Sequence, residues 1–127
     1  MKLNKKGQSV VETAIILPII LLLLMGMFEI SRIFGSYLLI NYVSRESARM
    51  AAVGRTDDEI VQSIYDKSAL LNLENVQIII EPEESSRRTG DNVNVLIKYR
   101  LTIYAPIVQS LIPNPFNMEA NTIMRVE

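Results

Sequence analysis

Residues 8–28 read QSVVETAIILPIILLLLMGMF, and residues 14–28 within them contain no charged side chain. At a rise of 1.5 Å per residue, a helix of this length reaches about 30 Å, the thickness of the hydrocarbon core of a bilayer. The preceding residues, MKLNKKG, are basic, and no comparable basic cluster immediately follows the apolar run. By the positive-inside tendency, the N-terminus is expected in the cytoplasm and the remaining chain outside it. The stretch therefore predicts one membrane-spanning helix.

A carboxylate, Glu12, lies near the start of this run. An acidic residue at the centre of a membrane helix costs roughly 2.5–3.5 kcal/mol, and less near the interface, so Glu12 should have a cationic partner. If the chain is cut between Gly7 and Gln8, the new α-amino group and Glu12 stand four residues apart on one helix face. The carboxylate could equally meet the α-amine of a neighbouring subunit. Taken alone, Glu12 is also explained as a first-turn acid that the helix dipole favours.

Two other interpretations of the N-terminus stay open. An ordinary secretory signal also combines a basic start with an apolar run, but this run is longer than usual and no small-x-small cleavage site follows it. A plain anchor would keep residues 1–7. Neither alternative explains the order of polar residues at the start of the run.

The helix should bend at one point and continue beyond the bilayer. Pro18 removes a backbone hydrogen bond and should bend or loosen the helix, which membrane helices tolerate where neighbours compensate. No proline interrupts residues 29–53, and Gly54 is a plausible helix stop. One face of this extension is apolar, with Ile30, Ile33, Phe34, Tyr37, Leu38 and Tyr42 at helical spacing. A second face carries only small residues: Gly35, Ser36, Ser44, Ser47, Ala48, Ala51 and Ala52.

Two pairs of opposite charge, Glu29 with Arg32 and Glu46 with Arg49, lie three residues apart on this extension. Such pairs are expected on a solvated helix face. The small face allows close approach of another element, so the extension should form the spine of an outer domain.

The remaining sequence predicts one further helix and three strands. A capping box, Thr56 with Glu59, begins a helix over residues 57–71. Alternating apolar residues predict strands over 76–80, 93–103 and 116–126. The prolines between the last two strands require an irregular connection, with one short helical turn at 107–111. The charged loop 81–91 between the first two strands could engage a partner through its acidic and basic halves, but a solvated loop is the expectation.

These elements predict an α+β fold. Three strands, each with one apolar face, form an antiparallel meander that the two helices cover, at the end of the long membrane helix. The outer part should fold alone when expressed from about residue 36.

Composition excludes several classes of function. The chain contains no cysteine and no histidine, which removes disulfides, thiol chemistry and the commonest metal ligand and general base. The net charge of −1 gives no electrostatic footprint for nucleic acid. No phosphate-binding loop or nucleophile motif occurs, and the acidic run at residues 57–59 is better explained by helix capping than by cation binding. We therefore expect no enzyme activity, cofactor, metal or small-molecule substrate.

The residues KKGQSVVE, 5–12, resemble a class III signal, and residues 7–32 together with SRESARMAAVG, 44–54, resemble the TadE-like family of minor pseudopilins from tight-adherence pilus systems. The matching residues include Pro18, Glu29, Arg32, Arg45, Glu46 and Arg49, and the final NTIMRVE is weakly similar to the last strand of the family. Ser47 departs from the family, in which many relatives have glycine.

The resemblance implies a pilin-like subunit with three parts. Residues 1–7 would be a leader that prepilin peptidase recognises through Lys5 and Lys6 and cuts after Gly7, before it methylates Gln8. Residues 8–28 would be a transmembrane and assembly helix in which Glu12 pairs with an N-terminal amine. Residues 29–127 would be the extracytoplasmic domain, with the helix extension to about 54.

Five charged residues of the helix extension are candidates for contacts with partners: Glu29, Arg32, Arg45, Glu46 and Arg49. The partners would be lipid, the peptidase, other pilins and the pilus-assembly platform, in the cytoplasmic membrane. A membrane-tethered binding or sensor domain that keeps its first seven residues is the competing interpretation.

Overall fold

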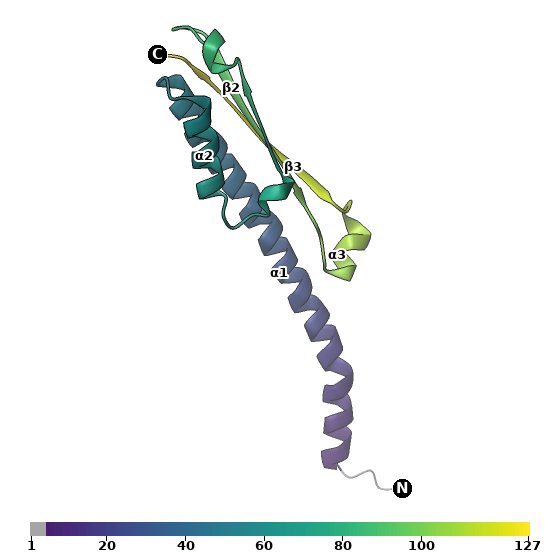
Figure 1. Cartoon of the computed structure of the whole chain (residues 1–127). Helices are drawn as coiled ribbons and strands as arrows, with labels where there is room; N and C mark the ends of the chain where they lie inside the picture. Colours follow the sequence, from purple (N-terminus) through teal and green to yellow (C-terminus); the bar gives the residue numbers. More distant parts are fainter. Residues whose placement is uncertain (1–4) are drawn as a thin grey trace.

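The structure, a computed structural model, describes residues 5–127, so residues 1–4 of the expected leader lie outside the described part. Figure 1 shows one long helix that extends well beyond a small domain of helices and strands. In chain order the elements are α1 (Lys5–Ala52), α2 (Asp57–Lys67), the 3-10 turn η1 (Leu73–Asn75), β1 (Val76–Glu81), the 3-10 turn η2 (Glu84–Ser86), β2 (Asn92–Leu101), α3 (Pro106–Leu111) and β3 (Phe116–Arg125). The predicted α+β fold is confirmed.

The long helix α1 ends at the predicted glycine. Gly54 has φ +82°, a left-handed conformation that glycine adopts without steric cost. Its N–H donates to the carbonyl of Ala51, and the N–H of Arg55 donates to the carbonyl of Met50. These two bonds form a Schellman motif, which satisfies the last carbonyls of the helix and turns the chain back toward α2.

The second helix begins as predicted and ends earlier. The Thr56 hydroxyl accepts a hydrogen bond from the backbone N–H of Glu59, whose carboxylate accepts one from the N–H of Thr56, so the capping box is formed. The helix ends at Lys67 and not at residue 71, because Ser68 leaves helical geometry and its carbonyl accepts from the N–H of Leu71 in a turn. This turn still buries Leu71 in the core.

The three strands form the predicted antiparallel meander in the order β1-β2-β3. Ile97 in the middle strand lies opposite Ile78 on β1 and Ala120 on β3, and all three point toward the helices. The strand β2 ends at Leu101, two residues before the predicted end. Beyond it the N–H of Ile103 donates to the side chain of Asn114, so the chain leaves the sheet there and enters α3.

The helices cover one face of the sheet, while the other face remains open (Figure 1). Most of the predicted small face of α1 is buried against the domain together with Ile40 and Val43, whereas Gly35 is exposed; the buried small residues are Ser36, Ser44, Ser47, Ala48, Ala51 and Ala52. The Ser44 hydroxyl lies 3.1 Å from the carbonyl oxygen of Val95 and 2.8 Å from the hydroxyl of Thr122. Small side chains allow this close helix–sheet contact, and the hydrogen bonds satisfy the polar group that it buries.

Candidate functional site

The first half of α1 has no contact with the domain and presents an apolar surface. An 18-residue window of this helix has a mean hydropathy of 2.5, and none of it is buried. Within residues 5–127, α1 is the one helix that is long and apolar enough to cross a membrane. A surface of this size is expected to be covered by lipid or by other helices.

The polar residues at the start of α1 form hydrogen bonds along the helix. The side-chain amide of Gln8 donates to the Glu12 carboxylate at 3.1 Å, which shows that the two residues share one face of the helix. The Thr13 hydroxyl is satisfied internally, since it donates to the carbonyl of Ser9 at 2.9 Å. Within residues 5–127 no cation contacts Glu12.

The residues around the expected cleavage site are exposed. Lys5, Lys6 and Gly7 form the first described turn of α1. A Cβ added at Gly7 would meet no atom within 4 Å, so a larger side chain at this position fits the helix. Any requirement for glycine at this position must therefore come from a partner.

The predicted helix perturbation does not interrupt α1. Pro18 lies inside the helix, which continues through it to Ala52. Figure 1 shows that α1 curves along its length. The missing N–H of a proline leaves one carbonyl of the preceding turn without its usual partner, which favours such bending.

Beyond the expected membrane span, a row of exposed apolar side chains continues along α1. This outer row consists of Ile30, Phe34, Tyr37, Leu38 and Tyr42. Phe34 remains 61% exposed, because the sheet packs on the neighbouring small face of the helix. Arg45 and Arg49, two of the predicted partner-facing residues, follow Leu38 and Tyr42 at a spacing of seven residues and are exposed. The outer row and the two arginines thus form one continuous surface.

The expectation of a solvated pair at Glu29 and Arg32 is wrong. Glu29 is only 6% exposed and pairs with Arg32, whose guanidinium also donates to the carbonyl of Thr102. The same guanidinium lies 5.0 Å from the centre of the Tyr104 ring, within cation–π range. The local spacing of the pair could not reveal this, since the burial comes from a segment 70 residues away. The pair ties the base of the domain to α1.

The second charged pair, Glu46 with Arg49, lies where α1 meets α2. The guanidinium of Arg49 donates to the Glu46 carboxylate at 3.1 Å, and the Lys67 ammonium lies 3.6 Å from the same oxygen. The hydrogen bond from Arg49 lowers the pKa of the Glu46 carboxyl below its ordinary value; partial burial opposes this shift, and the charges of Arg49 and Lys67 reinforce it. Glu46 therefore joins the two helices as well as forming the predicted pair.

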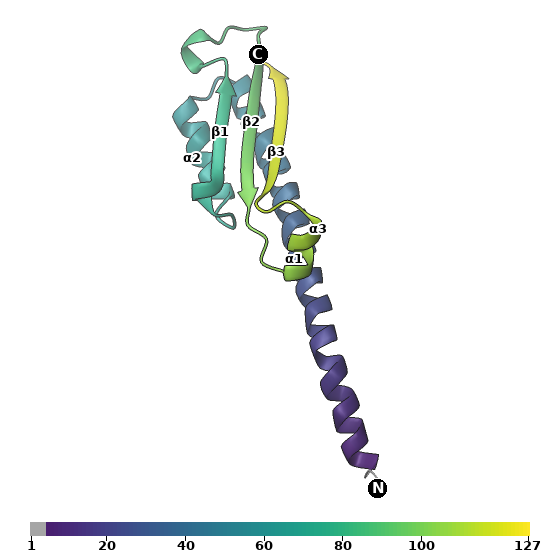
Figure 2. The ribbon, with the colours of Figure 1, turned by 90° about the vertical axis from the view of Figure 1, so that its right-hand side faces the viewer.

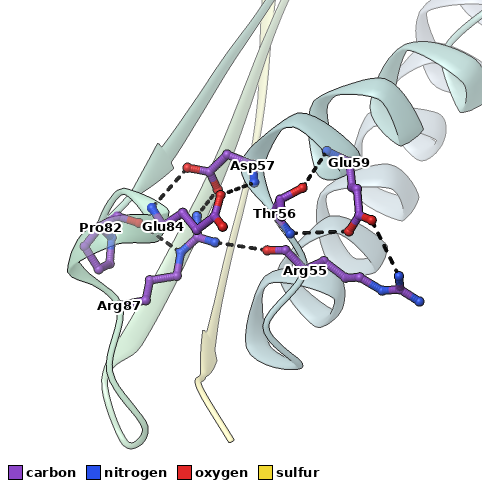
Figure 3. A network of polar contacts seen from close by, with 7 residues as sticks. All are labelled: Arg55, Thr56, Asp57, Glu59, Pro82, Glu84 and Arg87. Atoms are coloured by element: carbon purple, nitrogen blue, oxygen red, sulfur yellow. Dashed lines mark hydrogen bonds and ion pairs between the residues drawn. The ribbon is translucent and has the colours of Figure 1, made fainter.

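Most residues of the charged loop after β1 are exposed, as expected, but Arg87 and its partners attach the loop to α2. Arg87 is largely buried, pairs with Asp57 at the start of α2, and donates through Nε to the carbonyl of Pro82 at 3.0 Å (Figure 3). Glu84 and Asp57 exchange two hydrogen bonds, each carboxylate accepting from the other's backbone N–H at 3.1 and 3.2 Å. Of the acidic residues 57–59, Glu59 thus completes the capping box and Asp57 attaches the loop to the start of α2. Among the described residues, no group of His, Cys, Asp and Glu could hold a metal ion.

The fold and the exposed helix define a class: a helix-anchored α+β domain in which, within residues 5–127, the longest run of exposed apolar side chains lies on α1. Residues 7–49 match a family model described as TadE-like protein. The match covers about a third of the chain and lies entirely within α1, so it confirms the resemblance to the TadE-like family that the sequence motifs indicated. The match to this family suggests that the chain is involved in a tight-adherence pilus system. No curated protein and no solved structure matches the chain.

Proposed function

We propose that this protein is a minor pseudopilin: a non-enzymatic, membrane-anchored subunit that prepilin peptidase processes and that takes part in assembling a tight-adherence pilus or its secretion machine. The observation that supports this most is the position of the family match. It begins at Gly7, the residue before the expected cut, and runs to residue 49, so it includes the half of α1 that packs against no other element within residues 5–127. The subunit would lie in the cytoplasmic membrane with its domain outside.

Processing is proposed to occur between Gly7 and Gln8. The peptidase would use the basic residues Lys5 and Lys6 for recognition, and the cut would place a new α-amine on the helix face that carries Glu12. In the uncut chain the amide of Gln8 already occupies this face 3.1 Å from the carboxylate. A charged amine near this position would neutralise the carboxylate at the edge of the hydrocarbon.

The proposal is tested by replacing Gly7 with leucine in cells that have an active prepilin peptidase. We expect the variant to reach the membrane and to keep residues 1–7, while the unmodified protein begins at Gln8. The helix accepts a Cβ at Gly7, so loss of cleavage would report on the peptidase and not on folding. N-terminal sequencing and intact mass measure the outcome. Unmodified protein that still begins at Met1 under these conditions would overturn the proposal.

The outer row and Arg45 with Arg49 are proposed as the surface that meets other pilins or the assembly platform. Apolar side chains with a few arginines are typical of the central parts of protein interfaces. In this arrangement the domain leaves α1 free on one side along its whole length, from the membrane span to Arg49. The competing function, a tethered sensor, would use α1 only as an anchor and would keep residues 1–7.

A further inference from the structure

The connection between β2 and β3 differs in composition from the rest of the domain. Residues 102–118 read TIYAPIVQSLIPNPFNM and contain no charged side chain, although charged residues lie on both sides of the segment at Arg100 and Glu119. We refer to residues 102–118 as the foot. It includes α3 and forms a small apolar cluster of its own around Ile103, Ala105 and Val108.

The foot lies at the end of the domain nearest the apolar half of α1, as both ribbon views show (Figures 1 and 2). Its cluster packs against Ile33, and Arg32 donates to the carbonyl of Thr102. Ile33 lies five residues after the end of the apolar run at residue 28, which corresponds to about 7.5 Å along a helix. The headgroup region on each side of a bilayer is roughly 5–8 Å deep. The foot therefore stands at the level of the lipid headgroups when α1 spans the membrane.

The exposed side chains of the foot suit that environment. Leu111 is 78% exposed, and Ile107 lies one helical turn before it and is exposed as well. Tyr104 is exposed beside the guanidinium of Arg32. Tyrosine and arginine are the residue types that anchor proteins at the membrane interface, because each combines an apolar body with a polar end. Val108, on the other side of α3, is buried and fixes the short helix to the domain.

We propose that the part of the foot around α3 inserts into the outer headgroup region of the membrane, with Ile107 and Leu111 in contact with lipid and Tyr104 at the interface. The domain is then held against the bilayer at two points, α1 and the foot. Lipid is favoured over a protein partner by the absence of charge along the entire segment and by its continuity with the membrane span. This inference rests on α1 crossing the membrane, as in the proposed function.

The test uses the absence of tryptophan from the chain, which allows a single fluorescent reporter. Full-length protein is reconstituted into phosphatidylcholine vesicles with Leu111→Trp, and quenching is measured with acrylamide in the water and with bromine placed near the top of the acyl chains. Ile123→Trp is the matched control, because Ile123 is an exposed apolar residue on the far part of β3. Leu22→Trp, inside the apolar run, reports on the anchor itself.

We expect the reporter at 111 to be quenched by the brominated lipid and to show a several-fold lower acrylamide quenching constant than the reporter at 123. Equal acrylamide quenching at 111 and 123 would overturn the proposal, and so would shielding from acrylamide without lipid quenching, since that result means cover by a second copy. If Leu22→Trp is not quenched by the lipid, the anchor fails together with the proposed function. If the lipid quenches the reporter at 22 but not the reporter at 111, the anchor stands and only the insertion of the foot is overturned. Ile107→Trp, together with an unchanged circular dichroism melt, checks that no result comes from misfolding.

Discussion

At the scale of single residues, Glu12 is the carboxylate whose partner distinguishes assembly from simple anchoring. Glu12→Gln removes the charge and keeps the size, so insertion into the membrane should persist or improve. If an α-amine of Gln8 on the same or an adjacent subunit pairs with Glu12, the variant should co-purify with pilus components several-fold less than unmodified protein. Affinity purification from cells with an intact pilus system measures this.

The matched control for that change is Thr13→Val, which alters the neighbouring residue without changing volume or charge. Among the described residues its hydroxyl bonds only the carbonyl of Ser9, so the variant should assemble normally. Glu29→Gln is unsuitable as a control, because Glu29 is buried beneath the domain and its loss would disturb the contact of Arg32 with the foot. If Glu12→Gln and unmodified protein co-purify equally with pilus components, Glu12 is only a first-turn acid of the helix and has no role in assembly.

Glu46 predicts a pH dependence of stability. The pKa of its carboxyl is lower in the folded than in the unfolded chain. The ionised group therefore stabilises the fold at pH values above 4.5, the ordinary pKa of a glutamate carboxyl. This contribution is lost as the pH falls through the lower folded value. Glu46→Gln should therefore melt below unmodified protein near neutral pH, by an energy of roughly 0.2–1 kcal/mol, and the difference should vanish in acid.

Thermal melts across pH measure that difference. Glu83→Gln is the control, because within residues 5–127 the Glu83 carboxylate makes no ion pair. A difference between Glu46→Gln and unmodified protein that is constant down to strongly acidic pH would contradict the assigned role of the Arg49 hydrogen bond.

Local patterns predicted some of these residues better than others. Glu12, Gln8 and the Thr56–Glu59 box depend on neighbours within four positions, and the structure places each of them as the spacing indicated. The environments of Glu29 and Arg87 depend on segments 30 or more positions away, so local spacing could not predict them. A signal was present for the foot, since residues 102–118 carry no charge, but composition alone does not tell where in space such a segment lies.

At the scale of elements, the same substitution should cost much more stability on the covered face of the sheet than on the open face. Ile97 on β2 is 1% exposed and lies between Ile78 and Ala120, so Ile97→Ala should cost about 2–5 kcal/mol and unfold much of the protein. Ile123 on β3 is 61% exposed on the open face, and Ile123→Ala should cost at most about 0.5 kcal/mol. Denaturant titration followed by circular dichroism checks both values, and similar costs would contradict the layer arrangement.

The observed ends of the strands show how accurately the apolar periodicity of the sequence predicts element boundaries. Alternation predicted β1 and β3 to within one residue and the start of β2 to the same accuracy, because each strand has one buried face. It placed the end of β2 two residues too late, since Ile103 continues the alternation but is buried against α3 and not within the sheet. For α1, the sequence separated an apolar face from a small face. Only the packing shows that the small face meets the sheet and that the apolar outer row stays exposed.

At the scale of the whole molecule, the contacts at the base of the domain show that the independently folding part begins earlier in α1 than the sequence suggested. The sequence suggested a start near residue 36. The structure places Arg32 and Ile33 in contact with the foot, and Ile33 packs against both apolar clusters, so the boundary belongs at residue 29. Fragments 29–127 and 36–127 differ only in residues 29–35, about two turns of α1, which makes them a direct test.

We expect fragment 29–127 to fold cooperatively and to melt above fragment 36–127. The loss of the partly buried Ile33 side chain should cost about 1–2 kcal/mol, which lowers the melting temperature of a domain of this size by roughly 5–15 °C. Circular dichroism melts of both fragments measure the difference. Ile33→Ala within 29–127 removes the Ile33 side chain alone and should reproduce most of the difference, because the loss of that side chain is its main cause. If both fragments melt at the same temperature, the base of the domain contributes nothing to its stability. The Glu29–Arg32 pair would then serve only to orient the domain on the membrane helix.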